Sequence, residues 1–395
     1  MMKLNAVILK HGREASLSRN HHWVFSGAIH GKEGVMEEGE IIQVRSSMGV
    51  VLGYGHYHDA SIAVRILSFG DLPIDQNFWN EKIQRAWEVR RKLSLIDNDI
   101  TNAYRLVHGE GDGLPGLIID IYQDHAVVQC HTLGMYRNIE YIRLALEKVY
   151  DQKLKSIYNK SKESLDSQSP DIKNSFLSGH SQDTIIKENQ HLFHVDWVTG
   201  QKTGFFLDQR DNRQLLGSLC RNQSVLNLFS YSGGFSVYAL KNGASQVVSV
   251  DVSNKAIELV NKNVSLLSDE LQAKHVSVCT QVNQYLNDCD LYDIVICDPP
   301  AFAKSLNKRH QALIGYKNLN NKAISKVKAG GFLFTFSCSQ VMDRELFSQT
   351  ILSAGLESGR KIRILKHLQQ GADHPVNLYH PEGSYLKGLL LYLED

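Results

Sequence analysis

Residues 227–240 read NLFSYSGGFSVYAL, and this stretch decides the fold class of the C-terminal half of the chain. The apolar run Val225–Phe229 is typical of a short buried strand, a Ser/Gly turn follows it, and Phe235–Asn242 has the pattern of a helix. Gly233 and Gly234 would let the backbone approach a ligand closely, because glycine has no side chain. Taken alone, such a turn is about as often an ordinary connection between a strand and a helix.

The same alternation continues downstream and predicts an α/β fold. Strand patterns recur at 247–251, 276–279, 292–298 and 332–336, and helical patterns at 253–267 and 320–328. Ser253 is the predicted N-cap of the first of these helices. Alternating strands and helices indicate a parallel, Rossmann-like sheet with helices on both faces. In such sheets ligands bind beyond the carboxyl ends of the strands.

Asp251 narrows the ligand class. It ends the strand that follows the glycine turn, 17 residues after Gly234, where a carboxylate can accept hydrogen bonds from both ribose hydroxyls of a nucleoside. The Gly-x-Gly-x-x-Gly spacing of dinucleotide sites is absent. A nucleoside cofactor without a pyrophosphate, such as S-adenosylmethionine, therefore fits better than a nicotinamide dinucleotide. A dehydrogenase would share the sheet and the acid but not the two motifs described next.

The sequence CDPPAF, residues 297–302, is the first of these motifs. Pro299 and Pro300 end the strand and hold the backbone extended, which places Asp298 at the carboxyl edge of the sheet. A carboxylate and rigid carbonyls there can bind the edge of an extruded base, and Phe302 can stack on it. An isolated motif of this kind would be read as a simple Asp-Pro turn, but its place at the ligand edge favours a substrate site.

The second motif is FSCS, residues 336–339, at the end of the next strand, and it contains Cys338. A single cysteine after an apolar strand is more often a buried structural thiol. Adjacency to the Asp298 strand favours a nucleophile instead. Thiolate addition at C6 of cytosine makes C5 electron-rich enough to take a methyl group, and loss of the C5 proton then releases the thiol.

Basic and polar residues near these motifs are candidates for phosphate or carboxylate binding. Lys202, Gln209 and Arg210 lie in QKTGFFLDQRDNR (201–213), where a salt-bridged domain junction is an equal alternative. Lys304 follows the Asp-Pro-Pro turn and can contact RNA phosphate, with a solvated loop as the equal alternative. The histidines form no convincing metal set, and no metal is predicted.

The length of 395 residues predicts two or three domains. Residues 1–72 read as a small β-barrel with strands at 41–45, 49–54 and 63–67. Residues 73–197 read as a central α+β domain with helices at 77–95 and 136–150, paired strands at 116–121 and 126–130, and a polar loop or hairpin at 161–187. Asp75 or Asn77 is the expected cap of the first helix. Residues 198–395 form the predicted catalytic domain.

Composition sets weaker limits. The chain has no apolar run near the ~20 residues that span a bilayer and no signal-peptide pattern, so we expect a cytoplasmic protein. The six cysteines form no Cys-x-x-Cys pair, which argues against a zinc site. Residues 301–395 hold 13 Lys and Arg against 7 Asp and Glu, a balance that suits RNA but equally a lysine-rich solvated surface.

The motifs together resemble one family over nearly the whole chain. GREASLSRNHHWVFSGAI (12–29), EGDGLPGLIID (110–120), QKTGFFLDQRDNR, NLFSYSGGFS, CDPPAFAKS, FSCS and GADHPVN (371–377) are similar, in order, to bacterial 23S ribosomal RNA cytosine-C5 methyltransferases that carry a PUA domain. The resemblance implies a PUA barrel that holds RNA, a central linking domain, a Rossmann-like methyltransferase domain and a homodimer. It also implies Cys338 as nucleophile with Asp298 at the base.

The residue patterns and the resemblance together predict two sets of contacts, and the resemblance itself names Ser230–Gly234, Asp251 and Asp298 among them. The implied cofactor site comprises Phe229, Ser230, Tyr231, Gly233, Gly234, Asp251, Gln281, Asp298, Gln209 and Arg210. The implied RNA contacts are Pro299, Pro300, Phe302, Lys304 and Lys202. One departure concerns Gln281, which stands where many relatives carry an Asp that accepts from the adenine amine, although its carbonyl oxygen can still accept. Guanine methylation in the same RNA and a non-catalytic ribosome-assembly role are the alternatives.

Overall fold

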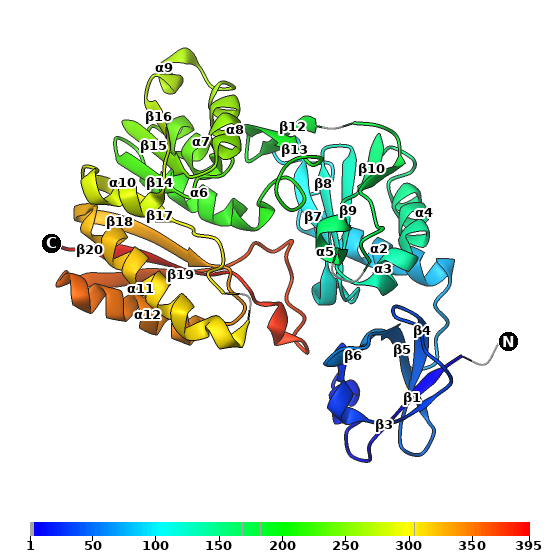
Figure 1. Cartoon of the computed structure of the whole chain (residues 1–395). Helices are drawn as coiled ribbons and strands as arrows, with labels where there is room; N and C mark the ends of the chain where they lie inside the picture. The colour runs from blue at the N-terminus through cyan, green and yellow to red at the C-terminus, as the bar shows by residue number, and fades with distance from the viewer. Residues whose placement is uncertain (1–3, 167–168, 182, 304) are drawn as a thin grey trace. The chain divides into compact units, whose positions relative to one another are not determined.

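The computed structural model describes residues 4–166, 169–181, 183–303 and 305–395, which form two compact units. Unit 1 comprises residues 1–186, 195–205 and 372–383, and unit 2 comprises 187–194, 206–371 and 384–395. The chain therefore passes from one unit to the other more than once. Figure 1 labels the elements of both.

The N-terminal part of unit 1 is a six-stranded sheet with the order β2-β6-β5-β4-β1-β3. Its buried core includes Val7, Val44, Val64 and Ile66. The predicted strands at 41–45 and 63–67 are confirmed, and the strand predicted at 49–54 begins two residues later and runs further. The elements are β1 (Ala6–Leu9), α1 (Ala15–Ser18), β2 (Trp23–Phe25), η1 (Ser26–Ala28), β3 (Ile29–Glu33), β4 (Ile41–Arg45), β5 (Val51–Tyr57) and β6 (Ile62–Phe69).

The central part of unit 1 is a five-stranded sheet, β11-β10-β9-β8-β7, packed against helices. Helix α2 (Gln76–Lys92) begins where Asp75 accepts a hydrogen bond from the backbone N–H of Phe78, as predicted. The other elements are β7 (Ala103–His108), η2 (Gly109–Asp112), β8 (Leu117–Tyr122), β9 (His125–Cys130), α3 (Leu133–Arg137), α4 (Ile139–Val149), β10 (Ser156–Asn159), α5 (Lys162–Leu165), β11 (Ser175–Ser178) and η5 (Pro381–Gly383).

Two details of this part differ from expectation. The helix predicted at 136–150 is two helices, α3 and α4, which meet at Asn138, whose amide donates to the Gly134 carbonyl and contacts the His56 ring. The polar segment 161–187 contains α5 and β11 in addition to most of β12 (Asp183–Glu188), which pairs with β13 (His191–Asp196). Its polar composition reflects an edge position rather than an absence of regular structure.

Unit 2 contains a seven-stranded sheet with the order β16-β15-β14-β17-β18-β20-β19. The strand pairs from β16 to β18 are parallel, as predicted, and β20 is antiparallel to both of its neighbours, which was not predicted. The strands are β14 (Ser224–Leu228), β15 (Gln246–Asp251), β16 (His275–Cys279), β17 (Tyr292–Cys297), β18 (Val327–Ser337), β19 (Ile362–Leu368) and β20 (Lys387–Leu393).

Helices cover both faces of this sheet (Figure 1). Leu226 and Leu228 of β14 pack with Tyr316 and Phe347, whereas Asn227 between them donates to Ser236 of α7. Because successive strand residues point to opposite faces, α7 lies on one face and the helices that carry Tyr316 and Phe347 on the other. The helices are η3 (Leu207–Gln209), α6 (Arg210–Leu219), α7 (Gly234–Lys241), α8 (Asn254–Val264), α9 (Asp269–Gln272), α10 (Val282–Asp288), η4 (Leu306–Lys308), α11 (Arg309–Ser325) and α12 (Arg344–Ser358).

The boundary between α11 and β18 was predicted wrongly. The helix begins at Arg309, because Ala312, Tyr316, Leu319 and Ala323 form one buried face at helical spacing. Strand β18 begins at Val327, five residues before the predicted start. In contrast, the predicted cap of α8 is confirmed, since the Ser253 side chain accepts from the N–H of Ala256.

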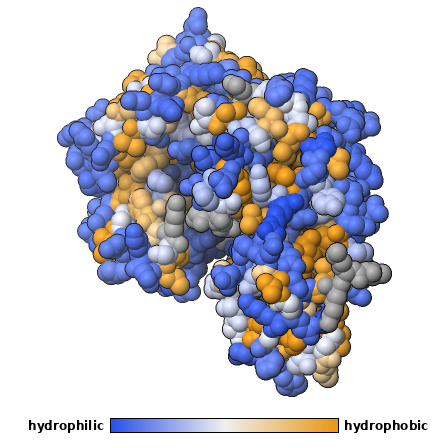
Figure 2. Space-filling view, turned by 45° about the vertical axis from the view of Figure 1, so that its right-hand side comes forward, coloured by the Kyte–Doolittle hydropathy of each residue, from blue (hydrophilic) through white to orange (hydrophobic). Residues whose placement is uncertain are grey.

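The described surface has the usual mixture of hydrophilic and hydrophobic residues. Hydrophilic residues cover most of the face shown in Figure 2, and hydrophobic residues form small separated patches. Scattered exposed apolar side chains of this kind are normal in folded proteins. Among the described residues, no helix is both long and apolar enough to cross a membrane.

Candidate active site

The carboxyl ends of the parallel strands bring the predicted site segments to one edge of the unit 2 sheet. In the strand register, Leu228 lies beside Val250 and Cys297, Asp251 beside Cys279, and Cys297 beside Thr335. The segments that leave this edge are 229–234, 251–253, 280–281, 298–302 and 337–339. The structure thus gathers all three motifs of the sequence at the place where open α/β sheets bind ligands.

The turn after β14 is tightly wound. Phe229, Tyr231 and Gly233 have φ of +57°, +45° and +72°, in the left-handed region. Gly233 begins α7 as its N-cap, and a Cβ there would lie 3.2 Å from the Val260 side chain. Glycine at 233 is therefore required by both backbone conformation and space.

Two polar side chains of this region are available to a nucleoside. The hydroxyl of Ser230 is buried and has no hydrogen-bond partner among the described residues, although the backbone around it is well paired. A buried polar atom of this kind normally has a partner, so a ligand is a natural one. Asp251 is half-buried, and its two oxygens accept one backbone N–H each, from Tyr231 at 3.0 Å and Ser253 at 2.9 Å. Each carboxylate oxygen retains capacity for a further donor. These groups fit the ribose of S-adenosylmethionine.

Gln281 lies on the neighbouring strand end. The N–H of Thr280 donates to the Asp251 carbonyl at 2.9 Å, which ties the 280–281 turn to the end of β15. Gln281 is the N-cap residue of α10, and its side chain is exposed. Its position beside Asp251 is compatible with the predicted contact to the cofactor, which stays a prediction.

A chain of amide hydrogen bonds leads to Asp298. The Gln209 side chain donates to Asp298 Oδ2 at 2.9 Å, and its own oxygen accepts from Asn212 at 2.6 Å. Asn212 also donates to the Gln369 carbonyl at 3.2 Å. The structure therefore connects two residues that were selected from separate motifs, and identifies Asn212 as a supporting residue that was not predicted.

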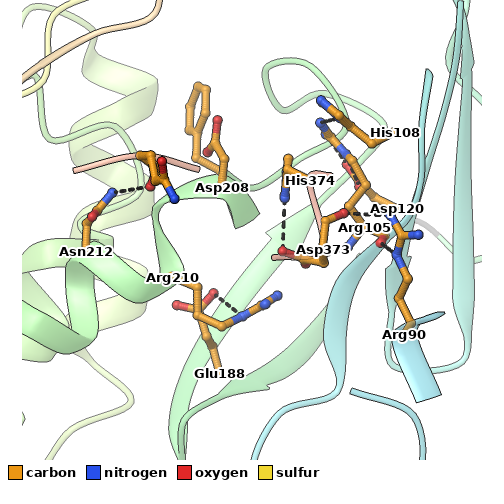
Figure 3. A network of polar contacts seen from close by, with 12 residues as sticks. Arg90, Arg105, His108, Asp120, Glu188, Asp208, Arg210, Asn212, Asp373 and His374 are labelled. Atoms are coloured by element: carbon orange, nitrogen blue, oxygen red, sulfur yellow. Dashed lines mark hydrogen bonds and ion pairs between the residues drawn. The ribbon is translucent and has the colours of Figure 1, made fainter. Parts of the chain in front are cut away.

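Arg210 lies in a buried ion network that was not anticipated as a whole (Figure 3). Its Nε is 3.6 Å from Glu188, and Arg213 binds the same carboxylate through two contacts of 2.8 and 2.7 Å. The Tyr238 hydroxyl also donates to Glu188. Burial with these partners raises the pKa of Tyr238 beyond its normal range. Nothing in the sequence marked Glu188, which lies 22 residues before Arg210 in a polar segment.

The loop that contains Asp298, Pro299 and Pro300 packs on helix α11. Pro299 is buried and Pro300 exposed, and Phe302 packs its ring at 4.5 Å from that of Tyr316. Phe302 is 38% exposed, so part of its ring remains accessible. Stacking of this residue on a base stays a prediction, whereas its packing on α11 is the contact that the structure contains.

Cys338 is half-buried between two buried serines, and its loop is bound to the Asp-Pro-Pro loop. The Ser339 hydroxyl donates to the Ala303 carbonyl at 2.8 Å. Burial, together with negative charge on Cys338 and on Asp298, raises the pKa of Tyr316 to about 12, so both groups are within electrostatic reach of one hydroxyl. Cys130, Cys220 and Cys297, in contrast, are buried, and burial raises their thiol pKa values.

Two predicted RNA contacts do not belong to the described residues of unit 2. Lys304 lies outside the described residues. Lys202 belongs to unit 1, where it is exposed and its charge helps to lower the pKa of His131 to about 4 after burial.

Unit 1 contains polar clusters of its own. Arg105 binds Asp120 through two contacts of 2.8 and 2.9 Å, and its backbone N–H donates to Asp373 (Figure 3). His21 and Glu382 are 3.3 Å apart beside His380. Both Asp373 and Glu382 come from the segment 372–383, which sequence reasoning assigned to the catalytic domain.

Comparisons with known proteins agree with this architecture. The family description "PUA-like domain" matches residues 7–69, and "S-adenosylmethionine-dependent methyltransferase" matches residues 104–341. The ribosomal RNA large subunit methyltransferase I of Vibrio cholerae is 37% identical over 97% of this chain and 98% of its own length. The chain belongs to the ribosomal RNA large subunit methyltransferase I family. A further member, from Shewanella amazonensis, is 38% identical over 97% of this chain and 98% of its own.

Members of this family use S-adenosylmethionine, and so does this chain. Two solved structures share the fold at 24% identity, covering 98% of this chain and 99% of their own. One, from Streptococcus mutans, is named for SAM-dependent methyl transfer and has a TM-score of 0.84. The other is described as complexed with SAH and has a TM-score of 0.85. The predicted α/β architecture with an N-terminal PUA-like domain is confirmed, whereas the boundaries at 72 and 197 stay predictions.

Proposed function

We propose that this chain methylates C5 of a cytosine in large-subunit (23S) ribosomal RNA, with Cys338 as the nucleophile. The family name supports the RNA class. The observation that carries the choice of base is a half-buried cysteine whose loop is bonded to the loop of Asp298. Methylation of a guanine would not need this thiol as a nucleophile.

The cofactor site follows from the β14–α7 turn and its neighbours. Ser230 and Asp251 hold the ribose, the backbone of 229–234 passes beneath the cofactor, and Gln281 accepts from the adenine amine. Gln209 and Asp298 define the side of the site nearest the substrate. Arg210 acts indirectly, through the Glu188 network, rather than by direct contact. When bound, S-adenosylmethionine supplies an electrophilic methyl group.

Cys338 supplies the covalent step. Its thiolate adds to C6 of the cytosine, which forms a carbon–sulfur bond and moves the electron pair of the C5–C6 double bond toward C5. After methylation, a base removes the C5 proton, the double bond forms again, and the sulfur leaves as thiolate. Asp298 holds the Watson–Crick edge of the base during these steps, oriented by Gln209.

We assign the remaining RNA contacts to five residues and to the PUA-like domain. Pro299 and Pro300 shape the rim of the base site, and Phe302 offers the exposed part of its ring. Lys304 and Lys202 meet phosphates, and the PUA-like domain holds RNA outside the target nucleotide.

The test is a map of methylated positions in 23S RNA from cells with and without this protein, by mass spectrometry of nuclease fragments. We expect loss of one 5-methylcytosine and its return with the wild-type gene but not with Cys338→Ala. Cys289→Ala is the matched control, because Cys289 follows α10 and precedes β17, at the edge of the sheet opposite the strand ends of the site. Loss of a methylguanosine with every methylcytosine retained would overturn the proposal.

A second readout isolates the covalent step. Fluorine at C5 cannot leave as a proton, so RNA that contains 5-fluorocytosine should remain bonded to the enzyme in the presence of S-adenosylmethionine. We expect a protein–RNA adduct that resists denaturation with wild type and C289A, and none with C338A. An adduct that forms equally with C338A would exclude this cysteine as the nucleophile.

A further inference from the structure

A lysine lies directly beside the cysteine loop. Lys387 is the first residue of β20, and the strand register places it opposite Ser337, the residue before Cys338. Its ammonium donates to the carbonyl of Ser339, the residue after Cys338, at 2.8 Å. The residue before the cysteine is therefore the strand partner of Lys387, and the residue after it accepts from the Lys387 side chain.

The environment of Lys387 is unusual for a lysine. The side chain is 3% exposed and is the charged residue of an otherwise apolar strand, KGLLLYL. An ammonium has three donors, and among the described residues Lys387 has one hydrogen-bond acceptor, a neutral carbonyl. Burying a positive charge with so little compensation is costly, and lysine is among the residues least often buried without a partner.

The charges around Lys387 come from two elements. Cys338 directly follows β18, Asp343 and Arg344 lie at the beginning of α12, and the charges of all three act on Lys387. Burial lowers the pKa of Lys387 to about 8, a lowering that negative charge on Cys338 opposes more than Asp343 does. The group that most favours the protonated lysine is thus the cysteine itself. Below pH 8 the ammonium form predominates.

We propose that the Lys387 ammonium holds Cys338 in its thiolate form and stabilises that thiolate again when it leaves C6 of the base. This inference rests on the proposed role of Cys338 and makes Lys387 a positioning residue, because it acts through the sulfur and not on the substrate. Opposite charges that interact in a water-poor site favour the ionised forms of both partners.

The proton balance of the pair is closed. In the resting enzyme the thiol proton passes to a neutral Lys387 amine or to water, which leaves an ammonium beside a thiolate. Addition to C6 consumes the thiolate and leaves the ammonium unpaired, and elimination restores the pair. No oxidant, reductant or additional reactant is needed.

The test measures the thiol and needs no RNA. Full-length protein is treated with iodoacetamide between pH 5.5 and 9.5, and alkylation of the peptide that contains Cys338 is followed by mass spectrometry. Lys387→Met removes the charge at similar length and suits a buried site, and Lys387→Arg keeps the charge. We expect the midpoint of alkylation to rise by at least one pH unit in K387M, which is about a tenfold slower reaction at pH 7, and to change little in K387R.

Each outcome is informative. A K387M profile that superimposes on wild type overturns the proposal, as does a K387R profile equal to that of K387M. Circular dichroism verifies folding, and Lys387→Gln, which keeps a donor for the Ser339 carbonyl, replaces K387M if that variant does not fold. Peptides with Cys279 and Cys289 are internal controls and should not shift. Failure of the proposed function has a different signature, namely undiminished methyl transfer by C338A whatever the alkylation profile.

Discussion

The side-chain amide of Gln209 donates a hydrogen bond of 2.9 Å to Oδ2 of Asp298. The two residues come from different elements, η3 and the loop after β17, and 89 positions separate them in the chain. Because Asn212 holds the oxygen of Gln209, the amide is oriented with its N–H₂ group toward the carboxylate. Asp298 is thereby held in one orientation.

Gln209→Leu tests this relationship. A hydrogen bond to a charged group contributes about 1.5–3 kcal/mol, so loss of it should lower kcat for methyl transfer by about tenfold or more. Steady-state assays with RNA measure kcat, and calorimetry measures the binding of S-adenosylmethionine separately. Gln349→Leu is the control, because Gln349 is exposed on α12 and its side chain donates to Glu345 in the preceding turn. Equal activity of the two variants would contradict the positioning role.

Glu188→Gln tests the buried ion network of unit 2. Removal of one charge leaves Arg213 buried without its partner, which typically costs about 3–5 kcal/mol. Urea unfolding followed by far-UV circular dichroism measures the loss of stability. Glu270→Gln removes the exposed helical pair with Lys274 and should cost less than about 0.5 kcal/mol. If both variants lose equally little stability, the network is not structural.

Gly233→Ala tests the nucleoside turn. The left-handed backbone at φ +72° disfavours any side chain by about 1–2 kcal/mol, and the new Cβ would also press on Val260. We expect weaker binding of S-adenosylmethionine in calorimetry, together with lower stability. Gly359→Ala is a matched control, since it has φ +71° but nothing within 4 Å of the added carbon. G359A should show the cost in stability without the loss of cofactor binding, and weakened binding in both would refute a local effect.

Buried histidines predict a loss of stability in mild acid. Burial lowers the pKa of His56 to about 3 and that of His22 to about 4, from an ordinary value of 6.5. Well above pH 6.5 both histidines are neutral in the folded and in the unfolded chain, so they do not lower the free energy of unfolding. As the pH falls below 6.5, these histidines bind protons in the unfolded chain but stay neutral in the folded chain. At pH 5 each histidine therefore lowers the free energy of unfolding by about 2 kcal/mol.

The four tryptophans all lie in unit 1, so their fluorescence in urea reports on that unit. His56→Gln should flatten the decline of stability between pH 6.5 and 5. His11→Gln should not, because His11 is exposed. A decline of the same slope in all three proteins would show that other groups are responsible.

The sequence by itself determined the elements whose causes are local. The β14 turn, the caps at Asp75 and Ser253 and the strand end at Asp298 each depend on residues within a few positions of one another, and all were predicted. Parallel strand ends share one edge, so the placement of Asp251, Asp298 and Cys338 at the same edge of the sheet could also be inferred. The boundary at α11 failed because its polar and apolar residues fit helix or loop equally well until the buried face is known.

Only the tertiary structure decided which distant residues share a charge or a hydrogen bond. The partnership of Glu188 with Arg213, the inclusion of 372–383 in unit 1, and the position of Lys387 beside Cys338 have no local signal. Such contacts form because burial removes water from charged groups, and each group then takes the partner that the fold brings within reach, however far apart the two lie in the chain.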